Sequence, residues 1–167
     1  AFFTYDINIV DSKGLNRLID HKLGDLRDIH FTGKLDERDQ NLQATLSLPF
    51  FRYDNIFSEE IFWSMDSEGA EGEIDFSVEK ILINDRTEFA PITLISFLDR
   101  DSLIFSLNYD DADRTAFLGN LELDGALSVV DSHFLQLSLD NSKLVIMEAP
   151  WQIDQNNVIA FVEDSVI

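Results

Sequence analysis

Residues 41–50 read NLQATLSLPF, and this stretch decides the fold class. Apolar and polar residues alternate in it, with Leu42, Ala44, Leu46, Leu48 and Phe50 on one side and Gln43, Thr45 and Ser47 on the other. Successive side chains of a β-strand point to opposite faces, so the pattern predicts a strand with one buried face. The run of Ile29, Phe31 and Leu35 repeats the pattern before a charged turn at 36–39. The two runs therefore predict a β-hairpin.

The period of two continues on both sides of this hairpin. It appears in residues 3–9, in 73–79 around Ile74, Phe76 and Val78, in 103–109, and in several short runs up to 158–162. The run PITLISFL at 91–98 is apolar on both faces, which is typical of a central strand. About ten short strands predict a mostly β, mainly antiparallel fold, a sandwich or a barrel, in a single domain over 1–167. A two-layer α+β domain is the alternative.

One helix interrupts the predicted strands, over residues 12–23. Asp11 or Ser12 supplies an N-cap oxygen, and Gly24 is placed to end the helix. The apolar residues between them fall on one stripe at helical spacing: Leu15, Leu18, Ile19 and Leu23.

Charge and composition limit the function classes. The 167 residues include 32 acidic and 12 basic side chains, for a formal net charge of −20. Such a chain is a poor direct binder of nucleic acid or of an anionic membrane surface, since both require Lys and Arg. There is no cysteine, which excludes disulfides and thiolate chemistry. No apolar run reaches the length of a transmembrane helix, about 18 residues or more, and we expect a cytoplasmic protein.

The acidity is concentrated in residues 53–79, which contain nine acids and no Lys or Arg. Large apolar residues are interspersed among these acids, and Trp63 lies between two pairs of acids in the sequence. Aromatic anchors and complementary charge are both features of protein interfaces. We therefore predict a surface that binds a positively charged partner, with these contact residues: Glu59, Glu60, Trp63, Asp66, Glu68, Glu71, Glu73 and Asp75.

Catalytic and metal signatures are missing from the sequence. The three histidines have no second histidine at ligand spacing, and the acidic loop at 110–113 lacks the later positions of a calcium-binding EF-hand loop. No nucleophile elbow, phosphate-binding loop or dinucleotide fingerprint occurs. We expect neither catalytic residues nor a cofactor, and a protein that is not an enzyme.

A small, cysteine-free, strongly acidic and β-rich domain resembles the immunity proteins of bacterial toxin–immunity systems, including contact-dependent growth inhibition. The resemblance lies in the composition of the whole chain. It implies a cytoplasmic inhibitor that occludes the basic active site of a cognate toxin, such as a nuclease domain, with carboxylates in the place of nucleic-acid phosphates. The first hypothesis is therefore an acidic protein inhibitor that is monomeric when free.

Two other hypotheses remain open. The many Phe, Leu and Ile residues are compatible with a β-barrel or sandwich that binds a small apolar ligand in a cavity. A structural or assembly subunit is the third hypothesis, and it would self-associate without any partner.

Overall fold

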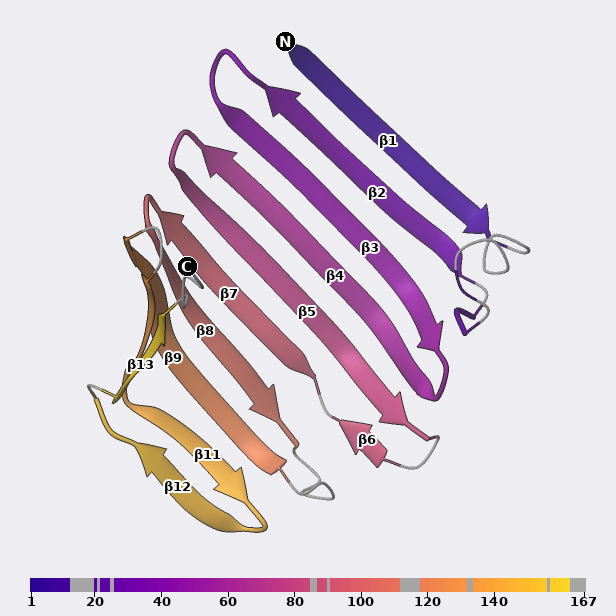
Figure 1. Ribbon diagram of the computed structural model, residues 1–167. Coiled ribbons are helices and arrows are strands. Elements are labelled where there is room, and N and C mark those ends of the chain that lie inside the picture. The colour runs from indigo at the N-terminus through magenta and orange to yellow at the C-terminus, as the bar shows by residue number, and fades with distance from the viewer. Residues whose placement is uncertain are drawn as a thin grey trace, which may run out of the picture.

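The strands form one open antiparallel sheet. The structure, a computed structural model, describes residues 1–12, 20, 22–24, 26–84, 87–89, 91–111, 118–131, 134–155 and 157–162. Figure 1 shows long strands laid side by side, with the far end of the sheet turned away from the rest. The thirteen strands are β1 (Phe2–Asp11), β2 (Arg27–Asp36), β3 (Asn41–Tyr53), β4 (Ile56–Glu68), β5 (Glu71–Ile83), β6 (Thr87–Phe89), β7 (Ile92–Asp99), β8 (Ser102–Asp110), β9 (Leu118–Asp131), β10 (Phe134–Leu139), β11 (Ser142–Ile146), β12 (Ala149–Ile153) and β13 (Asn157–Val162).

The sheet is a meander, because almost every strand pairs with its neighbour in the sequence. The main path runs β1-β2-β3-β4-β5-β7-β8-β9-β10-β13. The short strand β6 pairs with β5, and the β11–β12 hairpin extends from the other end of β9. The mostly β, antiparallel prediction is therefore confirmed.

Tight turns connect several of these strands. Several connections have only two residues, and in four of them the first residue adopts a positive φ: Asp54 (53°), Gly69 (63°), Arg100 (52°) and Met147 (49°). Two-residue hairpin loops favour this left-handed backbone because it matches the twist of the flanking strands. The meander follows directly from these short connections.

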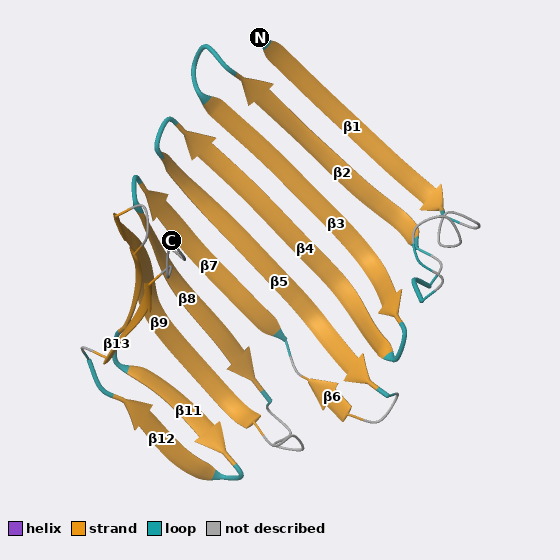
Figure 2. Cartoon of the chain, in the orientation of Figure 1, coloured by secondary structure: helices purple, strands orange, loops and turns teal. Residues whose placement is uncertain are grey.

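The predicted sandwich or barrel is wrong, and so is the two-layer α+β alternative. A second layer was expected to cover the apolar face of each strand, but all thirteen strands belong to one sheet that is not closed. Figure 2 shows strands and loops only, and no helix occurs among the described residues.

The helix predicted over residues 12–23 is also not found. Its middle, 13–19 and residue 21, lies outside the described residues. Its expected last residue, Leu23, instead forms a β-bridge with Tyr53, and Gly24 donates a backbone hydrogen bond to Arg52 O at 2.8 Å. The Tyr53 hydroxyl donates to Asp20 Oδ2 at 3.0 Å, and this bond raises the pKa of Tyr53 above its usual 10.0. Pairing with the end of β3 thus replaces the expected helix end.

Two glycines of β9 differ in the space around them, which gives a stability prediction. A methyl group on Gly125 would collide with Ser138 O and would meet the Phe105 ring at 3.0 Å, whereas Gly119 has its nearest neighbour at an ordinary 3.6 Å. We expect Gly125→Ala to lower the free energy of unfolding by about 1–3 kcal/mol through overpacking between β9 and β10. Gly119→Ala is the matched control and is expected to be neutral or slightly stabilising. Urea unfolding measures both, and equal effects would contradict this account of the close packing.

Candidate functional site

One face of the sheet is apolar across ten strands. Because side chains alternate between faces and the strands are in register, residues opposite one another form rows that cross the sheet. Three neighbouring rows of this face are Phe3–Leu35–Leu42–Ser67–Gly72–Leu98–Leu103–Leu127–Leu137–Ile159, Tyr5–Gly33–Ala44–Met65–Ile74–Ser96–Phe105–Gly125–Leu139–Asn157, and Ile7–Phe31–Leu46–Trp63–Phe76–Leu94–Leu107–Leu123. A fourth row is Leu48–Ile61–Val78–Ile92–Tyr109–Leu121–Leu144–Trp151. We call these four rows the apolar face.

The apolar face has no second layer over it in the described part of the chain. Its central side chains shield one another, so Leu48, Val78 and Tyr109 are buried and most of the others are half-buried. Toward the sheet edges the same rows become exposed, as at Phe3 (59%) and Trp151 (59%). Contiguous apolar surface beyond a few hundred Å² on a soluble protein marks an interaction site. The apolar face, with its continuous rows of apolar side chains, is therefore a candidate interaction surface.

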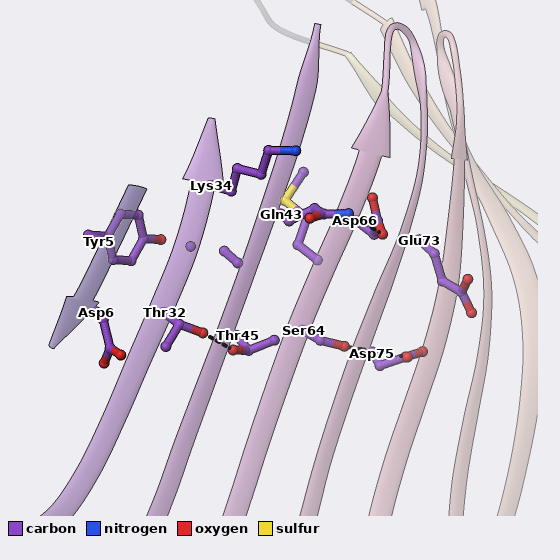
Figure 3. A pocket seen from close by; sticks show the side chains of 13 residues that line it. Tyr5, Asp6, Thr32, Lys34, Gln43, Thr45, Ser64, Asp66, Glu73 and Asp75 are labelled. Atoms are coloured by element: carbon purple, nitrogen blue, oxygen red, sulfur yellow. Dashed lines mark hydrogen bonds between the residues drawn. The ribbon is translucent and has the colours of Figure 1, made fainter. Parts of the chain in front are cut away.

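The opposite face is polar and contains a cavity of about 530 Å³ that crosses β1–β5. Figure 3 shows its two polar rows: Lys34, Gln43, Asp66 and Glu73 in one, and Asp6, Thr32, Thr45, Ser64 and Asp75 in the other. Hydrogen bonds connect neighbouring residues within each row. Gln43 Nε2 donates to Asp66 Oδ2 at 3.0 Å, and Thr32 Oγ1 lies 2.6 Å from Thr45 Oγ1. We call this cavity the polar trough.

The structure brings together five of the eight predicted contact residues. The five acids lie on the polar face at the closed end of the β4–β5 hairpin, where Asp66 pairs with Glu73 and Glu68 pairs with Glu71, and Asp75 is the next residue on that face of β5. None of these acids forms an ion pair with another described residue. We call them the acidic hairpin: Asp66, Glu68, Glu71, Glu73 and Asp75.

The other three predicted contacts are separated from the acidic hairpin. Trp63 lies on the apolar face, so the sheet stands between its indole ring and the acids. Glu59 and Glu60 lie toward the other end of β4, where Glu59 is in register with Lys80 and Phe50. Glu60, with a φ of 50°, falls opposite Pro49, which has no N–H to pair. The eight residues predicted from the sequence therefore do not make one surface.

A small apolar patch on the polar face is a feature that the sequence reading missed. It consists of Ile95, Phe97 and Ile104, which are 47%, 52% and 53% exposed. Phe97 is paired with Ile104, and Ile95 lies two residues from Phe97 on the same face of β7. The sequence signal for this patch is the run PITLISFL at 91–98, which is apolar at both alternating sets of positions. It correctly predicted a strand inside the sheet, but one of its two apolar faces is open to solvent.

The described residues contain no group of three or more His, Cys, Asp or Glu side chains placed to hold a metal ion. No helix in the described part of the chain is long and apolar enough to cross a membrane. Comparisons of the chain with protein-family models, curated proteins and solved structures found no match. The geometry of the two faces is therefore the basis for the functional proposals.

Proposed function

We propose that the protein binds the hydrocarbon chains of an amphipathic, lipid-like ligand on its apolar face. The observation that carries this proposal is the continuity of four apolar rows across one face that no described residue covers. Each large apolar side chain that leaves water contributes about 1.5–3 kcal/mol. A face of this extent therefore gives a strong driving force for binding of a long apolar ligand.

The chemistry of the face favours hydrocarbon over a ligand that forms many hydrogen bonds. Among its central side chains the polar groups are few, and Ser96 already donates its hydroxyl to Ile74 O at 3.1 Å. Ligand recognition there depends on contact area, which suits flexible acyl chains. The net charge of −20 repels an anionic headgroup, so we expect an uncharged or zwitterionic headgroup at the rim of the sheet.

This proposal modifies the apolar-ligand hypothesis from the sequence. That hypothesis expected a cavity lined by Phe, Leu and Ile, whereas the open sheet presents the same residue types as a surface. The ligand therefore lies along the sheet. A second copy of the chain packed face to face is the competing occupant, and it corresponds to the hypothesis of self-association.

Tryptophan fluorescence tests the proposal directly, because both tryptophans of the chain, Trp63 and Trp151, lie on the apolar face. A zwitterionic phospholipid with brominated acyl chains should quench Trp63 in the W151F variant. The same lipid without bromine should leave most of the fluorescence. Quenching of Trp63 that saturates at a fixed molar ratio is the expected result. A stable dimer that binds no lipid, measured by sedimentation of the full chain, would overturn the proposal.

A second function is supported by a different observation, the acidic hairpin. We propose that these five acids bind a basic protein, in the manner implied by the resemblance to immunity proteins. In this reading the protein is a cytoplasmic, non-enzymatic inhibitor of a toxin such as a nuclease. Complementary charge increases the association rate with such a partner and weakens with salt. Capture of a basic protein at physiological salt, with release as the salt rises, is the supporting result.

A further inference from the structure

We infer that the apolar patch of Ile95, Phe97 and Ile104 is the anchor point of a docking site for a basic peptide segment of a partner protein. This segment carries an apolar side chain between Lys or Arg residues. The inference deepens the second proposed function and rests on it. It assigns the contact that gives a basic partner its affinity, in addition to the acids that attract it.

The side chains of the apolar patch are exposed to solvent. Exposure of large apolar side chains to water on the solvated face of a sheet is unfavourable in free energy unless something covers them. All three patch residues are about half exposed. They lie next to each other, since Phe97 pairs with Ile104 on β8 and with Glu73 on β5. They therefore form one contact point and not three isolated residues.

The surroundings of the patch are acidic. Phe97 is in register with Glu73, and Ile95 is in register with Asp75 on one side and with Ser106, then Asp124, on the other. Strands β7, β8 and β9 contain no Lys or Arg. An apolar centre with an acidic rim is complementary to an apolar residue flanked by cations.

The surface is hollowed on both sides of the patch. The polar trough ends beside the patch at Glu73 and Asp75. A second cavity of about 620 Å³ begins at the patch and extends past Ser106 and Asp124 toward Asn141. A peptide that crosses the strands can place its apolar residue on Phe97 and its cationic residues in the two hollows.

The same chemistry argues against other occupants. Lipid phosphates are repelled by Glu73, Asp75 and Asp124, and a polyamine offers only short methylene spacers and no bulky apolar side chain to place on Phe97. A single-stranded nucleic acid could stack a base on the Phe97 ring, but its backbone would face the same three carboxylates. A basic protein segment uses both features at once.

Peptide binding tests the inference. The probe is a fluorescein-labelled peptide of sequence KKLKFKLKK, titrated into the full chain and followed by fluorescence anisotropy. Replacing the patch with F97S and I104S together should weaken binding at least tenfold while the slope of affinity against salt stays the same. The control pair V130S and M147S removes two apolar side chains that are at least as exposed (55% and 72%) but lie outside the patch, and it should leave affinity unchanged.

The outcomes distinguish the inference from the function on which it rests. If charge reversal in the acidic hairpin weakens binding but F97S with I104S does not, the basic-partner function stands and the docking site is wrong. If the wild-type chain does not bind the peptide, or if both serine pairs weaken it equally, the inference is also overturned. Thermal unfolding checks that the patch variant is folded. The single variant I104K, which places a cation in the patch, provides an independent measurement and should also weaken binding at least tenfold.

Discussion

The Leu94→Asp variant is expected to lose at least a hundredfold in affinity for a brominated acyl-chain ligand. Leu94 lies in the middle of the apolar face, between Phe76 and Leu107. A carboxylate there must give up part of its hydration when a hydrocarbon chain covers it. That cost is at least about 3 kcal/mol for a charged group without a partner, which corresponds to roughly a hundredfold in affinity. Quenching of Trp63 in the W151F background measures the loss.

Thr93→Asp is the matched control, because residue 93 adjoins Leu94 but points to the polar face. Thr93 is paired with Ser77 and Asn108, so the new carboxylate has no acid directly opposite. Lipid affinity should be unchanged within a factor of about two, while both variants change the net charge equally. Equal losses in the two variants would show that charge, and not the apolar face, determines binding. Circular dichroism establishes that Leu94→Asp keeps its sheet.

Reversing three acids of the acidic hairpin should reduce capture of a basic partner at least a hundredfold. Asp66→Lys, Glu73→Lys and Asp75→Lys together replace three attractive charges with three repulsive ones within one cluster. Close charge pairs at interfaces contribute about 1.5 kcal/mol or more each, so three of them exceed the requirement for a hundredfold change. Surface plasmon resonance against the captured partner, with the association rate recorded at several salt concentrations, measures the effect.

A control for this charge reversal changes Asp110, Glu148 and Asp154 to Lys. These acids are exposed and lie away from the acidic hairpin, at the end of β8, in the β11–β12 turn and after β12. The control has the same net charge as the test variant. It should lower affinity by less than about tenfold, because charges beyond about 8–10 Å are largely screened at physiological salt. Similar losses in both triple variants would mean that the partner responds to net charge only.

Much of the strand structure was predictable because a period of two is a local signal. The alternation of Leu42, Ala44, Leu46 and Leu48 with polar residues places these side chains on one face, and the structure confirms it. The same is true of Ile74 and Phe76 against Glu73 and Asp75. The acidic half of the candidate site therefore follows from the sequence.

The position of Trp63 could also have been predicted. Ile61, Trp63 and Met65 alternate with Phe62, Ser64 and Asp66, which separates the indole ring from the acids of the same segment. The prediction instead grouped Trp63 with the acids that neighbour it along the chain. Proximity in sequence does not mean a shared surface on a strand.

The missing second layer could not be predicted from local patterns. Alternation indicates that one face of a strand avoids water, but it does not indicate what covers that face. Only the pairing of all thirteen strands within one sheet reveals that no other part of the described chain does so. The predicted helix over 12–23 depended on apolar spacing and local cap signals, and the bridge between Leu23 and Tyr53 is a long-range contact that such local signals cannot indicate.

The meander has a consequence for how the chain unfolds. Among the described residues, all substantial contacts between strands are between hydrogen-bonded neighbours, and no layer connects distant strands. Such a chain behaves as a one-dimensional array, in which stability is approximately a sum of strand terms and nearest-neighbour terms, as in solenoid proteins. Pulled from its ends, it would peel strand by strand from either edge without breaking as a single cooperative unit. A ligand that spans many strands on one face would then connect distant strands, and the whole sheet would unfold as one cooperative unit.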